Sequence, residues 1–212
     1  GAKAYNELTV GTDNTDLKAD LKFVSHRTDL IEDGTFDGYV AAFQKLYPNI
    51  TIKYEGITDY ANELVGDKAL TPVHFCSGAA TGRDRADQPD YQVKMNVAFA
   101  FSNTVQCLEY YHNSSWLEHG GAPEKAMRSA FLSAMDGWLK QNNKYNKNEA
   151  KITWPDVQET LIFVSNNFST QTSYENQTKK SITNKFVQEA MTEFLRTNLE
   201  IYFIENLSLI HI

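Results

Sequence analysis

Hydrophobic and polar positions in the first 56 residues predict a strand, a helix and a second strand. Leu21–Val24 is typical of a short buried strand. Thr35 can cap the helix that follows, and Pro48 ends it. Apolar residues recur along this helix every three or four positions, namely Phe36, Tyr39, Val40, Phe43, Leu46 and Tyr47. Polarity then alternates over Ile50–Tyr54, so the order of elements is that of a βαβ unit.

The middle of the chain has the pattern of a different unit. A short helix through Tyr60–Val65 precedes the polar, turn-rich segment Gly78–Asp90, which we expect to be an exposed loop. Apolar residues at every second position of Val93–Phe101 predict the clearest strand of the chain. A turn at residues 102–103 then leads into a second strand that runs through Tyr110.

Two long helices complete the predicted fold. The first begins at Pro123, and its apolar stripe comprises Met127, Phe131, Met135 and Trp138. Thr153 begins a short helix, Leu161–Val164 is typical of a buried strand, and Ser169–Asn184 is polar. The last helix is expected to direct one apolar face toward the core, made up of Phe186, Val187, Ala190, Met191, Phe194 and Leu195. This irregular order of helices and strands predicts an α+β domain.

Composition limits the class of protein. The chain has 212 residues, a net charge of −7 and 42% apolar residues, enough to form a core. The acidic balance argues against a free-standing DNA-binding protein, whose contact surface is usually basic. No apolar run approaches the roughly 20 residues that cross a bilayer, so we expect no membrane span. Two cysteines, Cys76 and Cys107, are too few for a disulfide framework or a zinc cluster.

Most residues that could bind a metal ion have a simpler structural explanation. Cys107, His112 and His119 have spacings that match no standard metal site, so a turn histidine and a core cysteine are favoured. Asp84, Asp87 and Asp90 alternate with arginines without the spacing of a calcium loop, which favours a solvated charged loop. The sequence therefore predicts neither a metal site nor a catalytic site.

Gln177 and Lys179 are the exception. Two residues apart in an extended loop, they can point the same way and present an amide and an ammonium group to one anion. Lys is a strong point-charge partner for a terminal phosphate. Spacing alone still favours an ordinary polar loop over a phosphate sensor.

Four segments, in order over Ile57–Asn206, resemble the ATPase half of type IIA DNA topoisomerases, the gyrase B and topoisomerase IV B family. The segment SYENQTKKSITNKFVQEAM resembles the family's QTK loop. FSNTVQCLEYYHNSSWLEHGG, with AMRSAF after it, resembles a strand, an Asn-rich turn and a Glu-x-Gly-Gly motif before a helix. ITWPDVQETLIFVSNNF resembles a further family helix and strand. His119 and Ala122-Pro123 depart from the usual pattern around that turn.

The resemblance implies a transducer domain, an α+β fold with a left-handed βαβ crossover that links the ATP-binding domain to the DNA-cleaving core. Gln177 and Lys179 would contact the γ-phosphate of ATP. The catalytic base and the Mg²⁺ ligands would lie in domains outside this chain, so we expect it to bind no cofactor and hydrolyse no ATP alone. Implied partners are DNA, the topoisomerase A subunit and a second B subunit, in the cytoplasm. The segments do not distinguish gyrase from topoisomerase IV.

The first 56 residues resemble something else. LKFVSHRTDLIEDGTFDGYVAAFQKLYPNITIKYEGI is similar to the first βαβ unit of an extracellular sugar-type solute-binding protein, a secreted lipoprotein. His26, Arg27 and Asp29 would then lie in the ligand cleft. The alternative function is therefore a fragment of the carbohydrate-binding protein of an ABC transporter. A third interpretation is a chance βαβ match in an α+β domain with no function of its own.

The end of the chain differs again. LSLIHI, residues 207–212, resembles a translated sequencing adapter. We therefore divide the chain into a solute-binding fragment (1–56), a transducer domain truncated at both ends (57–206) and a non-native-looking tail (207–212). This division suggests an assembled chimera of metagenomic origin. We expect residues 1–56 to pack loosely on the transducer and to bind no sugar, since a single βαβ unit offers one wall of a cleft.

Overall fold

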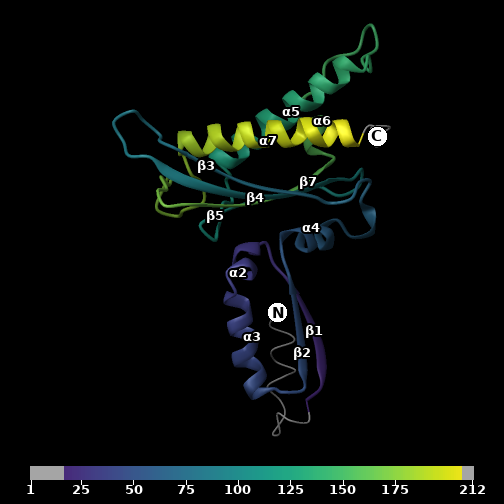
Figure 1. Ribbon diagram of the computed structural model, residues 1–212. Helices are drawn as coiled ribbons and strands as arrows, with labels where there is room; N and C mark the ends of the chain where they lie inside the picture. The colour runs from purple at the N-terminus through teal and green to yellow at the C-terminus, as the bar shows by residue number, and fades with distance from the viewer. Residues whose placement is uncertain (1–16, 207–212) are drawn as a thin grey trace. The chain divides into compact units, whose positions relative to one another are not determined.

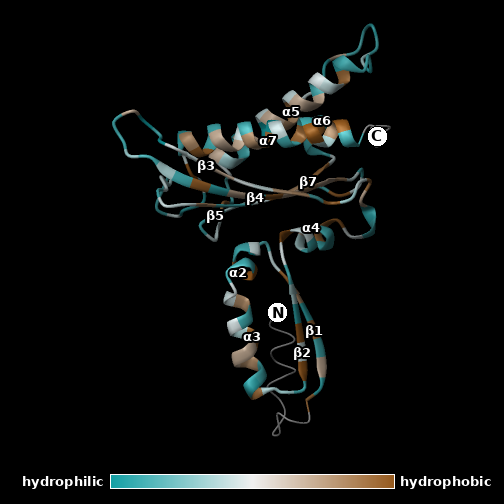
Figure 2. Cartoon of the chain, viewed as in Figure 1, coloured by the Kyte–Doolittle hydropathy of each residue, from teal (hydrophilic) through white to brown (hydrophobic). Residues whose placement is uncertain are grey.

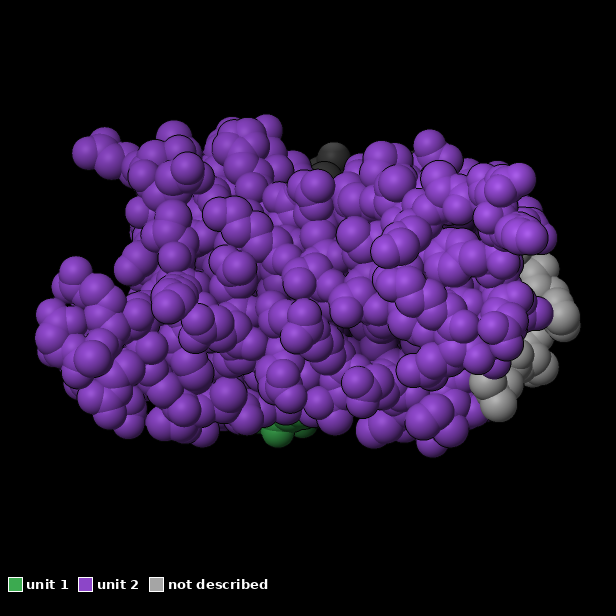
Figure 3. Space-filling model, turned by 90° about the horizontal axis from the view of Figure 1, so that it is seen from above, with its two compact units in different colours: residues 1–60 green, residues 61–212 purple. Residues whose placement is uncertain are grey.

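The computed structural model describes residues 17–206, and the chain divides into two compact units (Figure 1). Unit 1 comprises residues 1–60 and unit 2 residues 61–212, coloured separately in Figure 3. The division falls within helix α4 (Ile57–Val65), shortly after Gly56. The adapter-like segment lies outside the described residues. None of the helices within residues 17–206 is long and apolar enough to cross a membrane.

Unit 1 contains the predicted βαβ unit. β1 (Ala19–Val24) and β2 (Ile50–Glu55) form a two-stranded parallel sheet. Helices α2 (Thr28–Glu32) and α3 (Thr35–Leu46) connect the two strands. The prediction that Thr35 caps α3 is wrong. Gly34 is the N-cap residue, with φ at 77°, and Thr35 donates its backbone N–H to Asp33 Oδ1 at 2.8 Å.

Unit 2 is built on a five-stranded mixed sheet with the strand order β3-β4-β7-β5-β6. Only β7 and β5 are parallel neighbours; the other pairs are antiparallel. The strands are β3 (His74–Gly82), β4 (Tyr91–Phe101), β5 (Cys107–His112), β6 (Ser115–Trp116) and β7 (Leu161–Ser169). With its packed helices, this sheet confirms the predicted α+β class.

Two long helices cover one face of this sheet (Figure 1). They are α5 (Ala122–Gln141) and α7 (Lys185–Glu205), with the short α6 (Trp154–Gln158) between them in sequence. Figure 2 shows hydrophobic segments both in the sheet and in α7. The connection from β5 to β7 passes through α5 and α6, as in the crossover that the resemblance implies; its left-handed sense stays a prediction.

The core lies between these helices and the sheet. The Phe131 ring of α5 meets Phe99 of β4 and Phe163 of β7 edge to face, at centroid distances of 5.2 and 5.8 Å. All three residues are fully buried, which confirms the predicted register of α5. Met135 and Trp138 are only partly buried and line an apolar cavity of about 240 Å³. The apolar stripe of α5 is therefore most buried in its first half.

Part of the predicted loop at Gly78–Asp90 is strand. β3 continues through Gly82, which pairs with Tyr91 of β4. Gly78 and Gly82 both lie beneath aromatic rings of α7. A Cβ atom on Gly78 would lie 2.8 Å from the Phe194 ring, and one on Gly82 only 2.4 Å from the Phe186 ring. The glycines therefore allow α7 to approach the strand closely and do not mark a turn.

The predicted strand through Tyr110 exists as β5, but it is not the hairpin partner of β4. β7 is inserted between them and pairs with both. The turn residue Ser102 instead accepts hydrogen bonds from the backbone N–H groups of Thr104 and Val105, at 3.2 and 3.1 Å. The segment after β4 therefore crosses the end of the sheet.

Candidate functional site

The polar segment between β7 and α7 folds as a narrow hairpin, which we call the QTK loop (residues 173–183). Tyr174 and Ile182 form an antiparallel bridge. On either side of it, Thr183 N donates to Ser173 O at 2.8 Å, and Glu175 N donates to Ser181 O at 3.0 Å. Ile182 is buried, so the base of the loop is fixed in unit 2 while its tip projects.

Gln177 and Lys179 lie at this tip, and both are exposed. The extended backbone predicted for them is wrong. Lys179 N donates to Asn176 O at 3.3 Å, which closes a turn, and Lys179 has φ at +56°, unusual for a residue with a side chain. Thr178 Oγ1 donates to Asn176 Oδ1 at 2.5 Å within the same turn. A tight turn, and not a strand, presents the amide and the ammonium group.

The two adjacent lysines have different surroundings. Lys180 forms an ion pair with Glu118, which lowers the pKa of that carboxyl group, and its carbonyl oxygen accepts a hydrogen bond from His119 N at 2.9 Å. Lys179 Nζ lies 5.5 Å from the centre of the Tyr174 ring. Within residues 17–206, no carboxylate comes within ion-pair distance of Lys179. Lys180 therefore anchors the loop, and Lys179 is available to an external anion.

The Glu-x-Gly-Gly motif supports the other side of the loop. Gly121 pairs with Ile182 in a parallel bridge, and Ala122 N donates to Ile182 O at 2.8 Å. Gly121 has φ at +85°, and a Cβ atom there would lie 2.3 Å from Ile182 O. Only glycine allows this approach, so the motif serves to seat the QTK loop against the start of α5.

His112 and Asn113 hold the chain where it leaves β7. His112 Nε2 lies 3.0 Å from Ser169 Oγ and 3.2 Å from Thr172 Oγ1. Asn113 accepts from Ser169 N at 3.0 Å and donates to Ser169 O at 2.9 Å. Burial lowers the pKa of His112 to about 4, so its imidazole is neutral. His112 is the buried last residue of β5, whereas His119 lies in a turn before α5 as predicted, and Cys107 is only partly buried. The described residues contain no group of three metal ligands.

The residues proposed for a sugar cleft lie in unit 1, directly after β1. Arg27 and Asp29 bind each other, with Nε–Oδ1 and Nη2–Oδ2 distances of 2.8 and 2.6 Å, and this pairing raises the pKa of Arg27. The ring of His26 contacts Tyr60 edge to face at 6.0 Å. A hollow of about 420 Å³ in unit 1 lies at the opposite end of the strands, lined by Lys18, Ala19, Asp20 and Asn49. The structure thus brings His26, Arg27 and Asp29 together, but away from this hollow.

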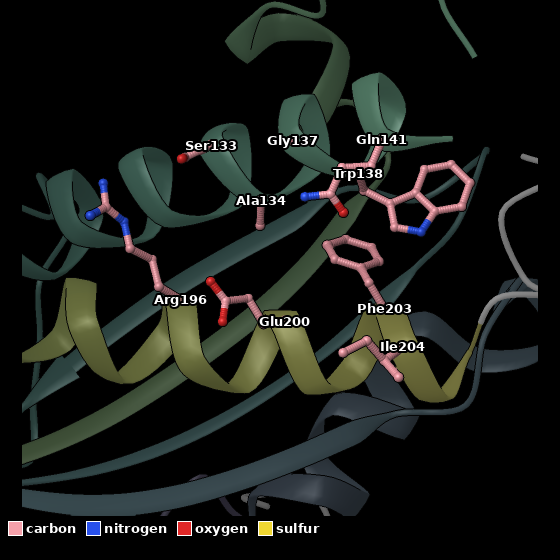
Figure 4. A pocket seen from close by; sticks show the side chains of 9 residues that line it. All are labelled: Ser133, Ala134, Gly137, Trp138, Gln141, Arg196, Glu200, Phe203 and Ile204. Atoms are coloured by element: carbon pink, nitrogen blue, oxygen red, sulfur yellow. The ribbon is translucent and has the colours of Figure 1, made fainter. Parts of the chain in front are cut away.

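A groove of about 620 Å³ runs between α5 and α7 (Figure 4). Trp138 and Phe203 form one end, and Arg196 and Glu200 lie along α7. Neither Gln177 nor Lys179 lines this groove. The tip of the QTK loop therefore lies outside this groove, with Gln177 and Lys179 exposed.

Comparison with known proteins agrees with the observed fold. The family model described as DNA gyrase B matches residues 56–211. The chain is 27% identical to the DNA gyrase B protein of Metamycoplasma hominis over 153 residues, which are 71% of this chain and 24% of that protein. It is 29% identical to the DNA gyrase B protein of Spiroplasma citri over 164 residues, which are 74% of this chain and 24% of that protein. The chain thus spans about a quarter of the length of these relatives.

Solved structures have the same fold. The 43K ATPase domain of Thermus thermophilus gyrase B, in complex with an aminocoumarin, superposes with a TM-score of 0.62 at 17% identity, over 76% of this chain and 44% of that one. The topoisomerase IV ATP-binding domain of Francisella tularensis, in complex with a small-molecule inhibitor, gives 0.57 at 18% identity, over 76% and 45%. The family match covers more than half of the sequence, and the chain therefore belongs to the DNA gyrase B family.

Proposed function

We propose that residues 57–206 are the transducer domain of the ATPase subunit of a type II DNA topoisomerase. In this role the domain couples ATP binding and hydrolysis, performed by another domain, to the passage of DNA strands. DNA, a topoisomerase A subunit and a second B subunit are the partners of the whole enzyme. Family membership and the shared fold support the proposal.

The QTK loop is the proposed sensor of the γ-phosphate. Gln177 would donate an amide hydrogen bond to it, and Lys179 would neutralise part of its charge. One observation carries this assignment: Lys179 is exposed at the loop tip, whereas Lys180 beside it is paired with Glu118. The amide N–H and the ammonium group can both donate to phosphate oxygens, and a positively charged ammonium group does not bind Mg²⁺. The metal ligands therefore belong to the nucleotide-binding domain.

Estimated interaction energies allow Lys179 to leave the Tyr174 ring and bind a phosphate instead. Its contact with the Tyr174 ring at an exposed site is worth about 0.5–1 kcal/mol. A charge-assisted hydrogen bond to phosphate is worth about 1.5–3 kcal/mol. Lys179 therefore rests on the ring when no nucleotide is present and moves to the phosphate when one is. In hydrolysis the same ammonium group stabilises negative charge on the transferred phosphoryl group.

The test requires the complete subunit. Residues 57–206 replace the corresponding segment of a full gyrase B protein, and steady-state ATP hydrolysis is measured for Lys179→Ala and Lys180→Ala. Loss of the phosphate contact should lower the rate of Lys179→Ala about 10- to 150-fold. Lys180→Ala removes only an exposed ion pair, worth at most about 1 kcal/mol, so its rate should fall less than about fivefold. A rate for Lys179→Ala equal to that of the unmutated subunit would refute the role.

A further inference from the structure

A triangle of polar side chains, two of them buried and Asp84 partly exposed, lies at the base of the QTK loop. Asn184 Nδ2 donates to Asp84 Oδ2 at 2.8 Å and to the Tyr91 hydroxyl at 3.1 Å. The Tyr91 hydroxyl donates in turn to Asp84 Oδ2 at 3.0 Å. Asn184 and Tyr91 are 2% and 3% exposed. The triangle joins the β3–β4 loop and the start of β4 to Asn184, the residue that follows the QTK loop.

Asn184 also connects the two ends of the QTK loop. Its Oδ1 accepts the backbone N–H of Ser173, the first residue of the loop, at 2.7 Å. Asn184 stands at the N-cap of α7, yet its side chain does not cap that helix. Asp84 does so instead, because Phe186 N donates to its Oδ1 at 2.8 Å. The carboxylate is well placed there, since a helix N-terminus favours negative charge. The predicted solvated loop is confirmed for Asp87 and Asp90, which are exposed, but Asp84 is only partly exposed and caps α7.

Every polar atom of the triangle has a partner. Asn184 uses both amide hydrogens and its oxygen, and Asp84 uses both oxygens. Burial raises the pKa of Tyr91 to about 12, so its hydroxyl remains a donor at neutral pH. Fully satisfied buried networks fix a unique geometry, and breaking one member leaves the others without partners.

We propose that Asn184 and Asp84 are positioning residues for the QTK loop. They fix its two ends and tie them to the β3–β4 loop (residues 83–90), so that the tip carrying Gln177 and Lys179 projects at one height and angle. This inference rests on the proposed function for its consequence in catalysis, but the effect on the loop is independent of it.

An exchange of the two side chains tests the proposal. Asn184→Asp alone places two carboxylates face to face, and Asp84→Asn alone places two amides there. The double variant restores every bond with donor and acceptor reversed: residue 184 still accepts from Ser173 N, and residue 84 still accepts from Phe186 N. Asp90→Asn is the matched control, because Asp90 lies in the same β3–β4 loop but pairs with Arg83 at the surface.

The first readout is amide hydrogen exchange of the complete 212-residue chain. Glu175 and Thr183 donate the backbone bonds that close the loop, so their protection reports its order. We expect Asn184→Asp and Asp84→Asn, each alone, to raise the amide exchange rates of Glu175 and Thr183 at least tenfold. The double variant and Asp90→Asn should leave these rates within about twofold of those of the unmutated chain. Unchanged protection in both single variants, or no recovery in the double variant, would overturn the proposal.

The second readout is ATP hydrolysis in the rebuilt subunit. We expect both single variants to lower kcat/KM for ATP at least tenfold, and the double variant to restore it. If Lys179→Ala lowers the rate while the single variants do not, the positioning role in catalysis is refuted. If Lys179→Ala has no effect, the phosphate-sensing function fails instead, and hydrogen exchange alone decides whether Asn184 and Asp84 order the loop.

Discussion

The two units contain the same motif with very different burial. Each has two adjacent parallel strands joined through helices, β1 and β2 in unit 1 and β5 and β7 in unit 2. In unit 2 the first seven residues of β7 are buried. In unit 1 neither α2 nor α3 has a buried residue, and none of the residues of β1 is buried. Hydrophobic periodicity therefore predicts whether a segment forms a helix or a strand, but the layers packed against that segment determine how much of its surface is buried.

The difference follows from the number of strands. The sheet of unit 2 has five strands and two long helices on one face, so apolar side chains find partners on several sides. Two strands are too narrow to cover an amphipathic helix, and Tyr39 and Leu46 of α3 remain 65% and 61% exposed. Small sheets of this kind are marginally stable alone. We therefore expect unit 1 to unfold under milder conditions than unit 2.

The largest expected effect is on the core of unit 2. Phe131→Ala removes a fully buried ring that contacts Phe99 and Phe163, which should lower the free energy of unfolding of unit 2 by about 3–5 kcal/mol. Urea denaturation followed by hydrogen exchange separates the two units. Phe36→Ala in unit 1 is the matched control and should leave unit 2 unchanged. An unfolding midpoint of unit 2 unaffected by Phe131→Ala would contradict the assigned core.

A pH titration sharpens the comparison, because a buried neutral histidine lies in unit 2. The pKa of His112 falls from 6.5 to about 4 on folding. Its contribution to stability is thus complete above pH 6.5 and is lost as the pH falls toward 4. Between pH 7 and pH 5 the chain should lose about 2 kcal/mol more stability than its His112→Gln variant. Equal losses in the two proteins would show that folding does not lower the pKa of His112.

Helix capping gives a smaller effect that can be assigned to one unit. In unit 2, Thr153 and Asp156 form a capping box at α6, with Thr153 N donating to Asp156 Oδ2 at 2.7 Å. Thr153→Ala should cost unit 2 about 1 kcal/mol. Asp33→Ala removes the acceptor of Thr35 N at the start of α3 and should lower the stability of unit 1 alone. Chemical denaturation of each variant should shift only its own unit. A common shift in both units would mean that the chain unfolds as one cooperative body.

The smallest effect concerns unit 1 as a binding module. Arg27 and Asp29 are hydrogen-bonded to each other, so we expect no saturable binding when millimolar oligosaccharides are titrated in a calorimeter. Arg27→Ala should not alter this result, although it removes the ion pair. Saturable binding by the unmutated chain, lost in Arg27→Ala, would instead support a solute-binding fragment in residues 1–56.

Sequence alone predicted most elements but few of the contacts around the loop. The periodicity of α5 and the alternation in β4 were sufficient because one face of each is buried. Gly78 and Gly82 were interpreted as turn residues. Their actual role beneath two phenylalanine rings could not be predicted locally, because those rings belong to α7, more than 100 residues later. The contacts of Asn184 with Asp84 and of Lys180 with Glu118 are also long-range in sequence, and no local pattern predicts them. The spacing of Gln177 and Lys179 allowed a phosphate contact but favoured an ordinary polar loop, and only the resemblance to a family motif led to their proposed role.

Nucleotide affinity in the rebuilt subunit tests the central claim most directly. Lys179 is proposed to contact the γ-phosphate, which a non-hydrolysable ATP analogue has and ADP lacks. Lys179→Ala should weaken binding of the analogue about 10- to 100-fold, the worth of one charge-assisted contact, and leave the ADP affinity unchanged. Lys180→Ala should alter neither affinity by more than about fivefold. Equal effects of Lys179→Ala on both nucleotides, or no effect on either, would contradict the account.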